Sequence, residues 1–253
     1  MNNSDLQQMD VKNCAAVSLM EELWQIENRE VLQMLDGGRG GLALQIAGPL
    51  GSISLAAALP NAGTVELAVA DDRSVFAPDC AITDLAELPV RTASLDTLVL
   101  LHTLERQARP LALIDEMDRV LVEDGELVIA GFNPYSLFGL FSRKRQYDIT
   151  PYRHSPAKVR HWLELTDLQV ERTVSNYFRP PIASQRWRGR TEMFDRLGLR
   201  LLPGRGALYV LRARKRTYRI TPVGIDLAAV RQLGGAGLPG AVRQGLRQNR
   251  DQG

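Results

Sequence analysis

The residues best placed to do chemistry follow short apolar runs. The stretch 44–52 reads LQIAGPLGS, an apolar run that continues into a loop with Gly48 and Gly51. Glycine lets a backbone turn sharply and approach a bound group closely, so this loop is typical of a site for a nucleotide-like cofactor. Pro49 stands between the glycines, where it fixes its own φ and removes an N–H donor. The loop is therefore stiffer, and has fewer glycines, than loops of this kind usually are.

Polar side chains follow the other apolar runs of the chain. They are Asp71 after 65–70, Asp84 after 80–82, His102 after 95–101, and Asn133 and Tyr135 after 126–132. Parallel strands end at one edge of a sheet, and ligands of open α/β sheets bind there. A carboxylate about 20 residues past the glycine loop suits ribose hydroxyls. A histidine titrates near neutrality, so His102 would either line the cofactor or act as a general base.

The elements that would position these residues alternate between strands and helices. Runs suited to buried parallel strands cover 41–48, 65–70, 80–82, 95–101 and 126–132, and two alternating runs, 168–178 and 207–214, suit an antiparallel pair. Helices are predicted over 16–36 and 52–60, from Pro110 to a stop at Gly125, from Pro156 behind the cap Ser155, and around 184–197. The pattern predicts an α/β protein with a doubly wound, Rossmann-like, seven-stranded and mostly parallel sheet that has an antiparallel edge pair.

Several of these stretches resemble the core of class I S-adenosylmethionine-dependent methyltransferases. The similar segments are TDLAELPVRTASLD, TLVLLHTLE and LIDEMDRVLVEDGELVIAGFNP, which follow in the family's order within 42–134. The flanking pieces GFNPYSLFGL and GALYVLRARKR are similar to a bacterial group of type 11-like members whose first glycine motif is degenerate. The resemblance implies S-adenosylmethionine as the cofactor and methyl transfer as the activity.

The resemblance also assigns roles in the first loop. The family has an acidic residue and then Gly-x-Gly-x-Gly; here Gln45 stands at the acidic position, and Ala47, Pro49 and Gly51 stand at the glycines, with Gly48 displaced. A hydrogen bond to a charged group contributes about 1.5–3 kcal/mol and a neutral one about 0.5–1.5 kcal/mol. The neutral Gln45 is therefore expected to weaken cofactor binding on the order of tenfold.

The remaining roles belong to the later loops. By resemblance, Asp71 holds the ribose, Asp84 and Leu85 meet the adenine, and His102 lines the cofactor. Asp71 and Asp84 have an alternative role as turn or cap residues. Asn133 and Tyr135 are predicted to touch substrate at the rim of the site, with a plain turn as the alternative. The sequence predicts no metal site and identifies no catalytic residue.

Composition excludes several classes of protein. The chain has 253 residues, 45% of them hydrophobic and 24% charged, which suits a core that needs neither disulfides nor metals. Its two cysteines, Cys14 and Cys80, are far apart, which argues against a zinc site or a disulfide framework. The first residues lack a signal-peptide pattern, and no apolar run reaches the roughly 18 residues of a membrane span. We expect a cytoplasmic protein.

Three parts are predicted along the chain: an N-terminal helical segment over 1–40, a methyltransferase-like domain over 41–220, and a basic, disordered tail over 221–253. From Arg212 onward nine basic residues face two acidic ones, a balance of +7, whereas the part before has −5. Such a tail could bind phosphates or an acidic surface, or could simply be solvated. The leading interpretation is methyl transfer to an unidentified acceptor. The alternative is a non-catalytic methyltransferase-like module whose tail binds a partner or nucleic acid.

Overall fold

The computed structural model describes residues 3–35, 40–47, 53–69, 81–82, 85–142, 152–179, 198, 200, 202 and 204–216. All of them belong to one compact unit, Met1–Thr217. The helix expected around 184–197 and the tail expected over 221–253 lie outside the described residues, so the domain boundaries stay a prediction.

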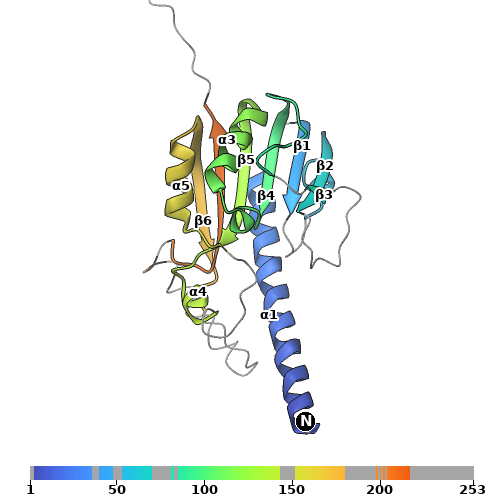
Figure 1. The fold of residues 1–253 in the computed structure, drawn as a ribbon, viewed down its shortest axis with the longest axis vertical. Coiled ribbons are helices and arrows are strands. Elements are labelled where there is room, and N and C mark those ends of the chain that lie inside the picture. Colours follow the sequence, from blue (N-terminus) through green and yellow to red (C-terminus); the bar gives the residue numbers. More distant parts are fainter. Residues whose placement is uncertain are drawn as a thin grey trace, which may run out of the picture. The chain divides into compact units, whose positions relative to one another are not determined.

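A seven-stranded sheet runs through this unit in the order β3-β2-β1-β4-β5-β7-β6 (Figure 1). Its strands are β1 Gly41–Ala47, β2 Ala62–Val69, β3 Ala81–Ile82, β4 Leu95–Leu101, β5 Leu121–Phe132, β6 Leu168–Asn176 and β7 Leu208–Lys215. Strands β3, β2, β1, β4 and β5 pair in parallel, and β7 runs antiparallel to both β5 and β6. The order reverses between β1 and β4, which creates a topological switch point. The predicted fold class is confirmed, including the antiparallel edge pair.

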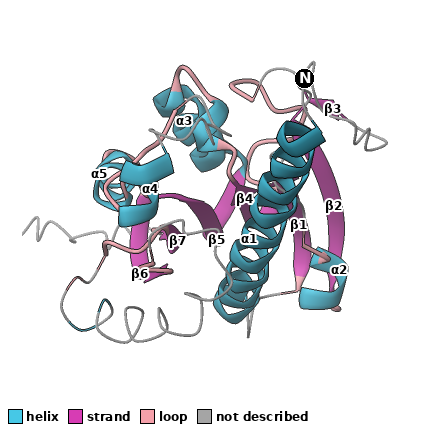
Figure 2. Ribbon diagram, turned by 90° about the horizontal axis from the view of Figure 1, so that it is seen from below, coloured by secondary structure: helices cyan, strands magenta, loops and turns pink. Residues whose placement is uncertain are grey.

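Helices cover both faces of the sheet (Figure 2). They are α1 Asn3–Leu35, α2 Leu55–Ala58, the 3-10 turn η1 Leu104–Arg106, α3 Pro110–Val120, α4 Leu137–Ser142 and α5 Pro156–Glu164. The helices α1 and α2 share a core with alternate residues of β1, β4, β5 and β7, including Ala43 and Val99. The helices α3 and α5 form the core on the opposite face, against Leu44 and Leu98. This division follows from the alternation of side chains along each strand.

Some predicted helix boundaries were wrong. The helix from Pro110 ends at Val120 and not at Gly125, because Leu121 is already extended and pairs with Leu95 of β4. Gly125 instead lies in β5, where a Cβ would stand 2.8 Å from the Val122 carbonyl oxygen. The helix expected over 52–60 is only α2, and α1 begins near the N-terminus and not at residue 16. The cap of α5 is confirmed, since Ser155 Oγ accepts a hydrogen bond from the Lys158 N–H at 3.3 Å.

Part of the basic C-terminal charge belongs to the sheet. Arg212 and Arg214 lie in β7, and their Nη2 atoms stand 2.5 Å and 2.7 Å from Oε1 of Glu126 on β5. Lys215 Nζ lies 3.4 Å from Oδ1 of Asp118. These cations are therefore already paired, and the excess of positive charge available to a partner is smaller than the sequence indicates.

Candidate active site at the carboxyl ends of the strands

The carboxyl ends of β1, β4 and β5 meet at one edge of the sheet. Ala47, the last residue of β1, pairs with Leu101, the last residue of β4. His102 follows directly, and its backbone N–H donates to the Ala130 carbonyl of β5 at 3.0 Å. His102 is therefore positioned at the switch point, one residue past the end of β4 and next to the end of β1.

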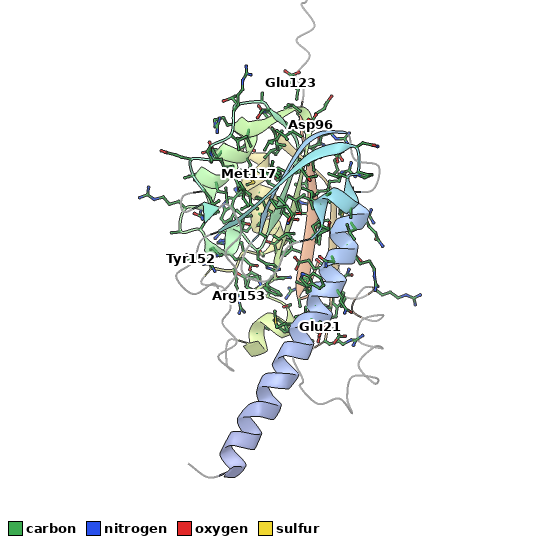
Figure 3. All side chains as sticks on the ribbon, turned by 90° about the vertical axis from the view of Figure 1, so that its right-hand side faces the viewer. Glu21, Asp96, Met117, Glu123, Tyr152 and Arg153 are labelled. Atoms are coloured by element: carbon green, nitrogen blue, oxygen red, sulfur yellow. The ribbon has the colours of Figure 1, made fainter. Side chains whose placement is uncertain are left out.

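The two ends of the sheet carry different side chains (Figure 3). Asp96 and Glu123, from the beginnings of β4 and β5, lie at one end, and Tyr152 and Arg153 lie toward the other. The Tyr152 N–H donates to the Glu105 carbonyl at 2.9 Å, which ties the segment before α5 to the loop after β4. The candidate site is thus at the Tyr152 end of the molecule.

Two carboxyl groups clamp the His102 ring. Nε2 lies 2.6 Å from Oε2 of Glu27 on α1, and Nδ1 lies 3.1 Å from Oε2 of Glu105. The other oxygen of Glu105, Oε1, accepts a hydrogen bond from the Phe132 N–H. His102, Glu27 and Glu105 are only 2%, 5% and 1% exposed. Because a carboxylate only accepts hydrogen bonds and both ring nitrogens face one, this geometry suits a protonated imidazolium.

The electrostatics of this cluster keep the ring charged. Burial alone would lower the pKa of His102, but the charges of Glu27 and Glu105 and their hydrogen bonds raise it from 6.5 to about 10. The ring is therefore protonated at neutral pH and has no lone pair with which to accept a proton. This argues against His102 as a general base, and its role in lining the cofactor stays a prediction.

The backbone at His102 is also unusual. Its φ is 51°, in the left-handed region that costs a non-glycine residue of order 1 kcal/mol or more. The ring packs against Phe132 with the centroids 4.4 Å apart, and the two carboxylates hold it from either side. Residues held in such a conformation are concentrated at functional sites.

Helix α1, which carries Glu27, faces the site with one row of buried side chains. Leu19, Leu23, Glu27, Val31 and Leu35 are spaced four residues apart and all are buried, because positions i and i+4 lie on one face of a helix. Glu27 is the charged member of this apolar stripe. The sequence analysis missed it, although a carboxylate in the middle of an inward stripe is the signal that could have identified it.

Gln45 is a further buried polar group on the α1 face of the sheet. It is 0% exposed, pairs with Val99 of β4, and is two residues past Ala43, whose side chain lies in the core under α1. Neither Oε1 nor Nε2 of Gln45 has a hydrogen-bond partner within the described part of the chain. A buried amide without partners costs about 1–3 kcal/mol per group, and a bound polar ligand would remove this cost.

The other predicted site residues are placed as follows. Leu85 is fully buried in the α3/α5 core, and Ala47 is 5% exposed at the end of β1. Asn133 donates through Nδ2 to the Gly204 carbonyl at 2.9 Å and accepts from the Tyr135 N–H at 3.1 Å, so it builds the turn after β5. Tyr135 is 63% exposed at that turn. Gly48, Gly51, Asp71 and Asp84 lie outside the described residues.

An ion pair on α3 fixes the segment that follows residue 84. Glu116 Oε1 accepts from the Leu88 N–H at 2.7 Å and from Arg119 Nη2 at 2.6 Å. Arg119 Nη2 also donates to the Val90 carbonyl at 2.8 Å. Arg119 lowers the pKa of the Glu116 carboxyl chiefly through its hydrogen bond. The pair holds the segment 88–90 against α3, and the sequence analysis did not find it.

Residues 35–129 match the family model of the methyltransferase domain. The match covers this part of the chain and shows what it is similar to. The matched range runs from the end of α1 into β5 and contains both Gln45 and His102. The match confirms the resemblance to class I S-adenosylmethionine-dependent methyltransferases and implies S-adenosylmethionine as the cofactor.

One curated relative and two solved structures are similar to this chain. The chain is 33% identical over 150 residues to the uncharacterised Escherichia coli (strain K12) protein YafS, which is 54% of this chain and about half, 55%, of YafS. A structure from Haloferax volcanii that contains the Trm112 methyltransferase activator and a proposed methyltransferase superposes with a TM-score of 0.54 at 14% identity, over 82% of this chain and 96% of that one. An Archaeoglobus fulgidus S-adenosylmethionine-dependent methyltransferase gives a TM-score of 0.51 at 19% identity, over 77% and 94%. These structural likenesses establish the fold.

The described residues fit the amino-acid end of such a cofactor. Among the described residues, neither Nε2 nor Oε1 of Gln45 has a hydrogen-bond partner, and a buried cluster with two carboxylates lies at the same sheet edge. An α-amino acid group carries both ammonium donors and carboxylate acceptors. None of the described helices is long and apolar enough to cross a membrane.

Proposed function

We propose that the protein is an enzyme that transfers a methyl group from S-adenosylmethionine to an acceptor that is still unidentified. The observation that carries this proposal is the position of the buried His102 cluster and of Gln45. His102 and Gln45 both lie toward the carboxyl ends of the central strands, within the range 35–129 that matches the methyltransferase domain. When bound, S-adenosylmethionine supplies an electrophilic methyl group. The chain's own task is then mainly to align the acceptor with that group.

The cofactor roles follow the sequence predictions. Gln45, Ala47, Gly48 and Gly51 would surround the amino-acid end, Asp71 the ribose, and Asp84 with Leu85 the adenine. His102 would line the site as a fixed imidazolium, which cannot take a proton from the acceptor. Asn133 and Tyr135 would form the acceptor side of the rim, with Tyr135 the exposed member. We propose that the protein works in the cytoplasm.

Titration calorimetry and thermal unfolding with S-adenosylmethionine test this function. A ligand that binds only the folded state adds stability, by about 2.7 kcal/mol at a concentration of 100 Kd. The melting temperature should therefore rise as the cofactor is added. No shift at millimolar cofactor would overturn the proposal.

The variant Gln45→Asp tests the assignment of the first loop. It restores a charge at the acidic position, so binding should tighten on the order of tenfold. Gln25→Asp, on the exposed side of α1, is a matched control that makes the same change away from the site. Equal effects of the two variants would contradict the loop assignment.

The alternative of a non-catalytic binding module receives no support from the relatives. The pairing of Arg212 and Arg214 inside β7 also removes part of the charge on which it rested. A truncation that tests nucleic-acid binding should begin after residue 217, because removal of residues from 212 onward would delete half of β7.

A further inference from the structure

The Glu27–His102–Glu105 cluster has one carboxylate oxygen that accepts no hydrogen bond from the described residues. Both oxygens of Glu105 are occupied, Oε1 by the Phe132 N–H and Oε2 by His102. Within the described part of the chain, Glu27 takes part in one hydrogen bond, in which Oε2 accepts from Nε2 of His102. A carboxylate has two acceptor oxygens, so Oε1 of Glu27 is the remaining acceptor. With one imidazolium and two carboxylates, the cluster also carries an excess of negative charge.

Gln45 supplies the second, independent observation. Neither polar atom of its buried amide has a hydrogen-bond partner among the described residues, and it lies on the same face of the sheet as α1. Val31 of α1 and Ala43 of β1 share one core cluster. Within this shared cluster, Glu27 lies one turn before Val31 along α1, and Gln45 lies two residues after Ala43 along β1. Helix α1 and strand β1 run in opposite directions (Figure 1), so both steps lead toward the carboxyl end of the sheet.

We propose that Glu27 is the anionic partner of the α-ammonium group of the bound cofactor, and that it supplies from α1 the charge that Gln45 lacks. This inference rests on the proposed function. An ammonium group has three N–H donors, and it needs at least one charged acceptor to be held strongly once it leaves water. Oε1 of Glu27 provides that charged acceptor, and the side-chain amide oxygen Oε1 of Gln45 provides a neutral one.

His102 and Glu105 act as positioning residues in this arrangement. The 2.6 Å contact between Nε2 and Oε2 fixes the Glu27 carboxylate from one side, so its other oxygen keeps a defined direction. Glu105 fixes the ring in turn, through Nδ1 at 3.1 Å. The imidazolium also offsets one of the two carboxylates, which makes burial of the cluster less costly before the ligand binds.

The test compares two ligands that differ in the group at issue. S-adenosylhomocysteine carries the α-amino acid group, and 5′-methylthioadenosine lacks it. Calorimetry on the full chain should show that Glu27→Gln weakens binding of S-adenosylhomocysteine about tenfold, the ratio expected between a charged and a neutral hydrogen bond. Binding of 5′-methylthioadenosine should not change. Glu21→Gln, an exposed position on the same helix (Figure 3), is the matched control and should leave both affinities unchanged.

Each other outcome has a defined meaning. An equal loss for both ligands would indicate a purely structural role for Glu27 and would overturn the inference, as would no loss for either. A wild-type protein that binds neither ligand would overturn the proposed function itself. If the wild type binds both ligands and Glu27→Gln changes neither affinity, the Glu27 role is overturned and the proposed function remains intact.

Two further variants keep the test decisive if Glu27→Gln does not fold. Glu27→Asp keeps a carboxylate beside His102, but its side chain is shorter by one methylene and the carboxylate lies farther from the ammonium group. Only S-adenosylhomocysteine should therefore bind more weakly. The double variant Glu27→Gln, Gln45→Glu returns a carboxylate to the strand and should recover most of the lost affinity for S-adenosylhomocysteine. Failure of both predictions would refute the inference.

Discussion

The substitution His102→Asn should destabilise the protein strongly, because it removes the one cation between two buried carboxylates. Glu27 and Glu105 are only 5% and 1% exposed, so neither can be rehydrated without moving α1 or the turn after β4. Removing one member of a buried ion pair typically costs about 3–5 kcal/mol. In a domain of this size each kcal/mol lowers the melting temperature by roughly 2–4 °C, so the expected fall is on the order of 10 °C.

The loss should also depend on pH in a defined direction. The pKa of His102 is raised from 6.5 to about 10, because Glu27 and Glu105 outweigh the opposing effect of burial. Below pH 6.5 the ring is charged in both the folded and the unfolded chain, and its stabilisation is fully present. Between these two values the unfolded chain releases the proton and the folded one keeps it, so stability falls by about 1.4 kcal/mol per pH unit. Above pH 10 the contribution is gone.

Urea unfolding of the wild type and of His102→Asn at several pH values from 6 to 10 measures this directly. The difference in the free energy of unfolding should be largest at pH 6 and should shrink steadily toward pH 10. His161→Asn, on the exposed side of α5, is the matched control and should show no such trend. A difference that is the same at every pH, or that grows with pH, would refute the imidazolium interpretation.

Three further substitutions test other parts of the structure by urea unfolding. Tyr209→Phe should be neutral or stabilising by up to about 1–2 kcal/mol, because the buried hydroxyl has no hydrogen-bond partner among the described residues; a clear loss of stability would contradict this. Arg119→Ala should cost about 1–2 kcal/mol, a loss that is present above pH 4.5 and disappears as the lowered pKa of Glu116 is passed in acid; a loss that persists in acid would argue against it. Gly41→Ala should destabilise, since φ is 138° and a Cβ would collide with the Asp96 carboxylate; Asp96→Ala in the same chain should relieve only part of the loss.

The sheet was predictable because its strands are short, buried and apolar. Leu95–Leu101 and the helix start at Pro110 were predicted to the residue, since a continuous apolar run and a proline at the first helical position are strong local signals. The end of α3 was not, because tertiary pairing of Leu121 with Leu95 takes precedence over a glycine that otherwise reads as a helix stop. Such pairing depends on residues about 25 positions away in the sequence, so a local sequence pattern cannot predict it.

The site was predictable only in part for the same reason. His102 could be placed at the sheet edge from the strand that precedes it, but its partner Glu27 is 75 residues away along the chain. The turn role of Asn133 depends on the carbonyl of Gly204, 71 residues away. Sequence patterns identify which residue ends a strand, and they do not identify which distant side chain meets it.

The position of Glu27 changes how the degenerate first loop should be judged. The family match begins at residue 35, so it contains Gln45, where the charge is missing, and excludes Glu27. Within that range alone, a neutral side chain and Pro49 indicate a weakened cofactor site. Yet α1 and β1 share one core, and Glu27 contacts His102 inside the matched range at 2.6 Å. If Glu27 of α1 supplies the negative charge for the ammonium group, then the site does not need a charge at Gln45 of β1. A judgement from the loop motif alone would then underestimate the affinity of the site for its cofactor. The affinities of Glu27→Gln and Gln45→Asp for S-adenosylhomocysteine would then change in opposite directions.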